Sequence, residues 1–308
     1  MDTAIFSNAA LATFGIQTAG FLAAYMLKTE IFYDILGGLN YILLAFLGHV
    51  GRQSEPASAR HSSMTCLFIA SRGWLLLFLA WRAHKRKGDS RFDGIKENPA
   101  IFFFVWMAQA AWVFLVSWPM MVVQSLDHGA DVIQQEMTMW DKIILLGFGL
   151  GVSMEIHADI QKTVWVSQGR PGGFCRIGLW NISRHPNYFG EIFQWWCAWL
   201  LSYGSLAANP DADSKALLFW FLGILSPLFS MNVLLNMSGT GVWAAEGKNL
   251  KRYYESDMAE AYKEYRESTS PLIPMFGYKD IPQSIKRRFL FEWERFEYRP
   301  STNNKKKE

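Results

Sequence analysis

The sequence predicts an all-α protein: a polytopic membrane bundle of about seven transmembrane helices, followed by a cytosolic amphipathic helix. Three observations predict this fold. Apolar residues make up 51% of the 308 residues and charged residues only 19%, below the roughly 25% charged residues of soluble domains. Several apolar stretches are long enough to cross a bilayer. Charged residues are most frequent in the last quarter of the chain.

Crossing the hydrocarbon core takes about 20 residues of helix, because every backbone amide there must be hydrogen-bonded within its own segment. The first apolar stretch follows an acidic residue where a signal peptide needs basic ones, so we interpret it as a membrane span and not as a cleaved leader. The seven predicted spans are 4–26, 31–50, 64–81, 100–123, 139–157, 188–208 and 215–237.

Charges in the connections predict the orientation, because loops rich in Lys and Arg stay in the cytosol. The connection 81–96 holds six basic residues and the connection 158–187 holds four, so both are predicted to be cytosolic. The connection 51–63 falls on the predicted lumenal side although it contains Arg52 and Arg60, which makes it a mild exception to this rule. Two connections contain acids and neither Lys nor Arg, which places them in a lumen: 124–138 and 202–214.

After the last span, apolar residues recur every three or four positions, which predicts one amphipathic helix within 247–276 that ends before Pro271. Its predicted face consists of Leu250, Tyr254, Met258, Ala261 and Tyr265. From about Tyr278 the chain is basic, and we expect a solvated tail. Two lysines near the C-terminus also resemble a dilysine retrieval signal of endoplasmic reticulum membrane proteins.

The stretch NISRHPNYFGEIFQWW places polar residues at the entrance of the sixth span. Pro186 suits a first helical turn, and helix N-termini bind anions. Arg184 and His185 are expected to add donors and positive charge there. Asn187 and Glu191 are four residues apart and share a face, and an acid inside a membrane helix usually faces a partner or a wet cavity. The alternative is an interfacial cluster in which Glu191 pairs with Arg184.

A second polar group ends the fifth span. Glu155, Asp159 and Lys162 stand at helical spacing on one face, and Arg170 and Arg176 follow in the next loop. Guanidinium groups suit phosphates, so the two groups together predict a concave site for a nucleotide-like ligand. The sequence contains neither GxGxxG after a strand nor GxxxxGK[ST].

Net charge and cysteine content bear on whether the protein binds nucleic acid or a metal. A net charge of +3 gives no support for a nucleic-acid partner. Three cysteines without a CxxC motif indicate neither a disulfide framework nor a zinc site, and no metal is expected.

Several motifs occur in the order found in the membrane-embedded steroid 5-alpha-reductase superfamily. They are EIHADIQK, FCRIGLWNISRHPNYFGEIFQWW and YKEYRESTSPLIP, with SRFDGIKENP before them. Within the superfamily the chain most closely resembles the branch called DUF1295, over about Arg72 to Phe276. The RHPxYxG core is less specific, because sterol reductases and isoprenylcysteine carboxyl methyltransferases carry similar versions.

The resemblance implies an endoplasmic reticulum bundle that holds NADPH from the cytosolic side and reduces the carbon–carbon double bond of an enone lipid. It places Asp159, Asn187 and Glu191 near the nicotinamide or ribose, and Arg72 near the cofactor phosphates. An arginine within an apolar span also needs a partner on physical grounds. The other residues predicted to bind the cofactor are Lys162, Arg170, Arg176, Arg184, His185 and Tyr188.

The sequence also departs from the reductase pattern. Ile69 stands where the reductases have a tyrosine that polarises the carbonyl, and Gly173 stands where they have an arginine. The glutamate of their second span has no obvious counterpart. Asp34 and Tyr41 lie seven residues apart on one helical face and are the predicted catalytic pair; they are equally compatible with an interfacial cap and a packing tyrosine.

Three functions are compatible with these observations. The first is an NADPH-dependent reductase of a lipid-soluble enone, with membrane lipids as its surroundings. The second is an S-adenosylmethionine-dependent methyltransferase, since EGKNLKRYYES resembles the C-terminal pattern of the isoprenylcysteine enzymes. The third is a scaffold without catalysis. The basic residues favour NADPH, because it carries more phosphate charge. The predicted regions are 1–98 with three spans, 99–276 with the cofactor site, and 277–308 as the tail.

Overall fold

The computed structural model describes residues 1–50, 56–86, 92–127, 134–237 and 241–297. Within these residues the chain is helical, and its only extended pairing is a single parallel bridge between Ser183 and Ser270. The predicted all-α class is therefore confirmed.

The described chain divides into two compact units. Unit 1 comprises 1–152 and 193–229, and unit 2 comprises 153–192 and 230–308. These units do not follow the three predicted regions, since residues 99–152 belong to the same unit as residues 1–98. Helices α6 (Met139–Ser167), α7 (Pro186–Ala208) and α9 (Leu225–Leu235) contribute residues to both units.

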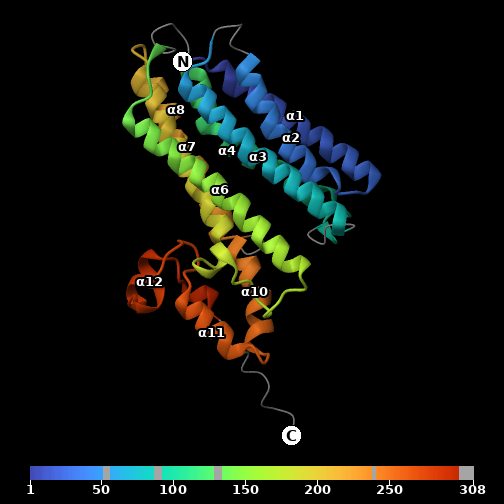
Figure 1. The fold of residues 1–308 in the computed structure, drawn as a ribbon. Coiled ribbons are helices and arrows are strands. Elements are labelled where there is room, and N and C mark those ends of the chain that lie inside the picture. Colours follow the sequence, from blue (N-terminus) through green and yellow to red (C-terminus); the bar gives the residue numbers. More distant parts are fainter. Residues whose placement is uncertain (51–55, 87–91, 128–133, 238–240, 298–308) are drawn as a thin grey trace. The chain divides into compact units, whose positions relative to one another are not determined.

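Unit 1 is built on four long helices that lie side by side (Figure 1). They are α1 (Ala4–Leu27), α2 (Phe32–Val50), α3 (Ala59–Arg86) and α4 (Pro99–Leu126). The shorter α8 (Ser214–Leu222) packs on α4. Asn98 starts α4 because its side chain accepts hydrogen bonds from the amides of Ala100 and Ile101.

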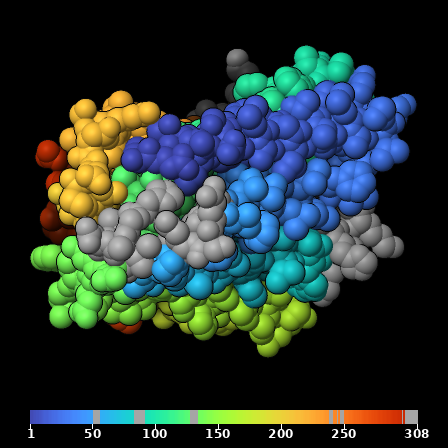
Figure 2. Space-filling model, turned by 90° about the horizontal axis from the view of Figure 1, so that it is seen from above, coloured from blue at the N-terminus to red at the C-terminus, as the bar shows by residue number. Residues whose placement is uncertain are grey.

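Helix α1 shows how the unit is packed. Gly20 leaves room for the ring of Trp106 from α4, so the two helices approach closely. Near the other end of α1, Phe6 packs edge-on against Phe219 of α8, with ring centroids 4.8 Å apart. The opposite face carries exposed apolar side chains such as Leu11, and Figure 2 shows α1 in dark blue along the surface. An apolar outer face of this kind suits contact with lipid.

Six helical segments are long and apolar enough to cross a membrane, which indicates an integral membrane protein. They are Ala4–Leu27, Phe32–Val50, Ala59–Arg82, Pro99–Leu126, Met139–Ser167 and Ser214–Leu235. The sixth predicted span, 188–208, forms the helix α7 but is not among them; its first turns carry Asn187, Glu191 and Gln194. The seventh predicted span is broken at Gly223 into α8 and α9.

The mild exception to the loop-charge pattern has a structural explanation in unit 1. Arg60 lies in α3, not in a loop, and is buried. Its Nη2 is 2.7 Å from Oδ2 of Asp141, which also accepts a hydrogen bond from the Thr138 amide. Asp141 therefore neutralises the buried charge of Arg60. Arg52 lies outside the described residues.

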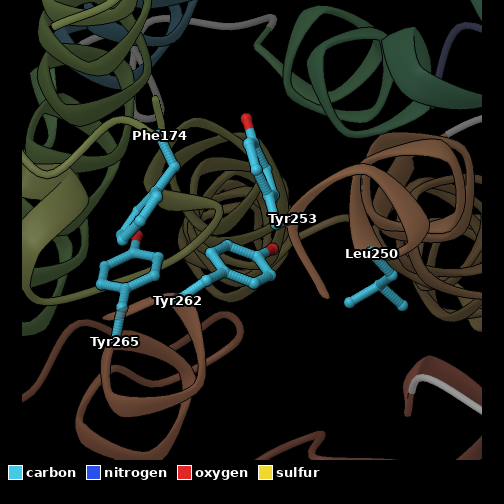
Figure 3. Close-up of a cluster of buried hydrophobic side chains, with 5 residues drawn as sticks. All are labelled: Phe174, Leu250, Tyr253, Tyr262 and Tyr265. Carbon is cyan, nitrogen blue, oxygen red and sulfur yellow. The ribbon is translucent and has the colours of Figure 1, made fainter. Parts of the chain in front are cut away.

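Unit 2 contains α10 (Gly241–Tyr254), α11 (Ala259–Ser268) and α12 (Gln283–Phe289). Three short 3-10 helices accompany them: η2 (Gly178–Asn181), η3 (Tyr278–Asp280) and η4 (Glu294–Phe296). The apolar centre of the unit is a cluster of buried aromatic and aliphatic side chains (Figure 3): Phe174, Leu250, Tyr253, Tyr262 and Tyr265.

The single amphipathic helix predicted within 247–276 is wrong, because the chain turns between Tyr254 and Ala259 and forms α10 and α11 instead. Its apolar face was largely right. Leu250 and Tyr265 are buried in the same cluster, with Tyr254 and Met258 packed against it, whereas Ala261 is exposed.

The solvated tail expected from Tyr278 is also wrong as far as residue 297. Tyr278, Lys286 and Glu292 are all at least nine-tenths buried. Tyr278 donates a hydrogen bond of 2.7 Å to Glu292, so this segment packs back into unit 2. The two lysines of the predicted retrieval signal lie within 298–308, outside the described residues.

Candidate functional site

The entrance of α7 is positioned by backbone contacts with the segment after α11. The amide of Arg184 donates to the Ser270 carbonyl at 2.8 Å, and Ser183 Oγ donates to the Leu272 carbonyl at 2.7 Å. The amide of Met275 in turn donates to the Ile182 carbonyl at 3.1 Å. Residues 182–184 are thereby fixed just before the helix begins.

Asp159 and Asn187, two of the predicted site residues, lie together in unit 2. The Asn187 side-chain amide donates to Oδ1 of Asp159 at 3.1 Å. Trp180 holds α6 against η2 by donating from Nε1 to the Ala158 carbonyl at 2.9 Å. The Asn187 Oδ1 atom is buried and accepts no hydrogen bond in the described structure. A buried acceptor without a donor is costly, so this atom suits the hydroxyl or amide of a bound ligand.

Three predicted phosphate-binding residues have no ion pair within the described part of the chain: Lys162, Arg170 and Arg176. The Lys162 ammonium lies 3.9 Å from the centroid of the Trp180 ring, and the Arg176 guanidinium lies 4.6 Å from that of Phe174. Arg170 and Arg176 are exposed. Cations held on aromatic faces keep their donors free for an anion.

The conformation of the loop that carries Arg170 and Arg176 bears on the departure at Gly173. Its backbone has φ +79°, which disfavours residues with a side chain. A Cβ atom at this position would also collide with the sulfur of Met258. A side chain at this position would therefore strain the backbone and displace the end of Met258, and Arg170, with its own φ of +61°, presents the neighbouring guanidinium.

Arg184 lies within a buried ion-pair network. Its guanidinium pairs with Glu246 at 3.2 Å and also with Glu292. Arg266 pairs with the same two carboxylates, at 2.7 Å and 3.5 Å. Burial alone would raise the pKa of Glu246, but Arg184 and Arg266 outweigh it and lower that pKa to about 2. Arg184 therefore pairs with Glu246 and Glu292, and not with Glu191 as the alternative interpretation had it. These buried partners favour a structural role for Arg184.

His185 does not add the positive charge expected at this position. Its ring is 5% exposed, and burial lowers its pKa to about 4, so the ring is neutral at physiological pH. Nδ1 donates to the Pro271 carbonyl at 2.9 Å, which fixes the tautomer. The ring of Tyr188 stacks on His185, with centroids 5.4 Å apart. Glu191, one turn further along α7, is buried as well.

Arg72 and Tyr41, predicted for separate roles, lie together in unit 1. Arg72 is 1% exposed, and its guanidinium lies 4.7 Å from the Trp195 ring centroid and 5.6 Å from that of Tyr41. Its Nη2 also donates to Ser71 Oγ at 2.9 Å. Asp34 is half-buried in the first turn of α2, and Ile69 is exposed on the outer face of α3.

Sequence reasoning missed three members of the ion-pair network: Arg266, Tyr278 and Glu292. Glu246 is the first residue of EGKNLKRYYES, the stretch that resembles the isoprenylcysteine methyltransferases, and was not predicted to pair with Arg184. Glu292 is 108 positions from Arg184, so no local pattern joins them. One signal was available, because Arg266 lies four residues after Tyr262 and is a charge on an apolar helical face.

The predicted convergence of Arg72 with Asp159 and Asn187 stays a prediction, since Arg72 belongs to unit 1 and the other two to unit 2.

Comparison with curated proteins and with solved structures gives no match. The model of one protein family, described as a protein of unknown function (DUF1295), matches residues 20–269. This match includes Asp159, Asn187 and the RHPNYFG motif and extends over most of the chain. The chain therefore belongs to the DUF1295 family.

Proposed function

We propose that the protein is an NADPH-dependent oxidoreductase of the endoplasmic reticulum membrane, with its cofactor site facing the cytosol. Its substrate would be a lipid-soluble α,β-unsaturated carbonyl compound, whose carbon–carbon double bond is reduced. The observation that carries this proposal is the partly buried Asp159–Asn187 pair, in which the buried Oδ1 atom of Asn187 accepts no hydrogen bond, close in sequence to three basic residues without ion pairs. The resemblance to the steroid 5-alpha-reductase superfamily supplies the reaction class.

The donor set in unit 2 fits a dinucleotide. Lys162, Arg170 and Arg176 would hold phosphates, and Asn187 Oδ1 would accept a hydrogen bond from a ribose hydroxyl or a carboxamide. Asp159 orients the Asn187 amide by accepting its hydrogen bond. The bound cofactor would supply the hydride.

In unit 1, Tyr41 and Arg72 would act on the substrate carbonyl. Hydride addition to the β-carbon would give an enolate with negative charge on the carbonyl oxygen, which a nearby donor and a positive charge stabilise. A proton from solvent would then add to the α-carbon and complete the reduction. The Tyr41 hydroxyl would donate to that oxygen, and the guanidinium of Arg72 beside the ring would favour the developing charge. Asp34 remains the predicted acid of the same helix. The apolar helices of the unit suit a substrate that partitions into lipid.

The test uses the full-length protein in detergent. We expect NADPH to raise its melting temperature saturably, and deuterium from NADPH labelled on the transferred position to appear in a lipid extracted from cells that lack the protein. Stabilisation by S-adenosylmethionine alone would instead identify a methyltransferase. Stabilisation by neither ligand, together with no deuterium transfer, would identify a protein without either chemistry.

A further inference from the structure

A cavity of about 420 Å³ lies in unit 2, and none of the predicted cofactor-binding residues lines it. Its size is in the range of small-molecule sites, roughly 300–1,000 Å³. Its lining comes from the end of α10, from α11, η3 and α12, and from the segment after α12, and includes Lys263, Tyr278, Gln283 and Lys286. Gln283 and Lys286 lie beyond residue 269, where the family match ends.

Lys286 is the feature of the cavity that points to a ligand. It is 7% exposed, and its ammonium lies 4.3 Å from the centroid of the Tyr278 ring. Its two hydrogen bonds, to the carbonyl oxygens of Glu267 and Lys279, are both 3.4 Å long and therefore weak. Within the described residues it has no carboxylate partner. Lysines are almost never buried without one.

Lys286 is a buried charge without an ion pair within the described residues, whereas the other buried charges beside it are paired. Arg184 and Arg266 pair with Glu246 and Glu292, and the buried ammonium of Lys286 takes no part in these ion pairs. Glu297 also lines the cavity, but Arg287 holds its carboxylate at 2.9 Å. The two other charges on the lining, Lys263 and Glu267, are exposed and of opposite sign. An anion in the cavity would remove the cost of the unpaired buried charge.

We propose that this cavity binds the oxyanion group, phosphate or carboxylate, of a small ligand, with Lys286 as the buried counter-charge. Lys263 at the opening and the Gln283 amide supply further donors. The same chemistry is presented by a soluble metabolite and by the headgroup of an anionic lipid.

Calorimetric titration of the full-length protein in detergent tests the proposal, with inorganic phosphate and succinate as separate probes. We expect at least one probe to bind saturably. Lys286→Met keeps the aliphatic stem against Tyr278 but removes the charge, and it should weaken binding by about tenfold or more. Lys279→Met is the matched control, because Lys279 is exposed, does not line the cavity and undergoes the same change of charge.

Lys263→Met provides an independent variant if Lys286→Met does not fold, because Lys263 is exposed; it should also weaken binding severalfold. The proposal is overturned if neither probe binds, or if the folded variants at 286 and 263 bind like the unaltered protein. Competition by phosphatidic acid in nanodiscs would identify a lipid headgroup as the source. Binding of the probes that persists in those nanodiscs would identify a soluble ligand.

Discussion

The side-chain amide of Asn187 donates a hydrogen bond of 3.1 Å to Asp159, and this contact joins the first turn of α7 to the last third of α6. Asn187→Ala removes both the donor and the buried acceptor. We expect a weaker affinity for NADPH, by about tenfold or more, because a ligand hydrogen bond and its orienting contact are both lost. Asp159→Ala should act in the same direction.

Titration of NADPH monitored by fluorescence would measure both affinities, and circular dichroism would show that the helices are retained. Asn181→Ala is the control, since Asn181 is exposed. Unchanged affinity in both site variants would exclude this pair from the cofactor site.

Breaking the buried ion-pair network should destabilise unit 2. Arg184→Met leaves Glu292 and Glu246 with one arginine instead of two, and removing one member of a buried pair typically costs about 3 to 5 kcal/mol. Arg287→Met removes an exposed arginine that pairs with Glu294 and should cost about 1 kcal/mol or less. Thermal unfolding in detergent compares the two. Equal effects would show that the network contributes no more than a surface pair.

The stability of the protein should fall in mild acid because of His185. Burial lowers its pKa to about 4, below the roughly 6.5 of an unfolded chain. The neutral form is therefore favoured in the folded state, so the contribution is fully present above pH 6.5 and is lost as the pH falls towards 4. His185→Gln should flatten this part of the profile of melting temperature against pH. A profile identical to that of the unaltered protein would contradict the neutral, buried histidine.

Gly173→Ala should destabilise the loop between α6 and α7, by about 1 to 3 kcal/mol, through both backbone strain and the collision with Met258. Gly169→Ala separates the two causes, because Gly169 also has a positive φ but open space around it. We expect the larger loss of melting temperature at position 173. A double variant that shortens Met258 to Ala should recover part of the difference.

Tyr41→Phe tests the proposed role of the hydroxyl without removing the ring beside Arg72. Turnover of an enone lipid should fall, whereas the affinity for NADPH and the melting temperature should stay close to those of the unaltered protein. Asp34→Asn should likewise lower turnover with little effect on cofactor affinity. Full turnover in either variant would remove that residue from the catalytic set.

Most of the helices were predictable, because helices that cross a membrane are long, apolar runs whose signal lies within one segment. In unit 2, where helices and loops pack on one another, the local sequence pattern did not predict the structure correctly. The turn between Tyr254 and Ala259 interrupts a continuous apolar periodicity, and Phe174 from a distant loop fills the centre of the cluster formed by the two resulting helices.

The same distinction applies to the site. Asp159 and Asn187 each lie in a recognisable motif, and their pairing follows from adjacent helix ends. The partners of Arg184 were not predictable, because Glu246 and Glu292 come from segments brought to it only by the fold of unit 2. Arg184 was interpreted as a ligand-binding residue because it lies near the start of a helix. Its counter-charges are instead glutamates that lie far from it in the sequence.

The ion pair between Arg60 and Asp141 has a consequence for biosynthesis. Arg60 leaves the ribosome 81 residues before Asp141, so the third helix reaches the translocon while its arginine still lacks a counter-ion. We therefore expect the start of the third helix to reach its final position only after the fifth apolar segment brings Asp141 to the arginine. Nascent chains arrested before Asp141 should leave the start of the third helix accessible to water.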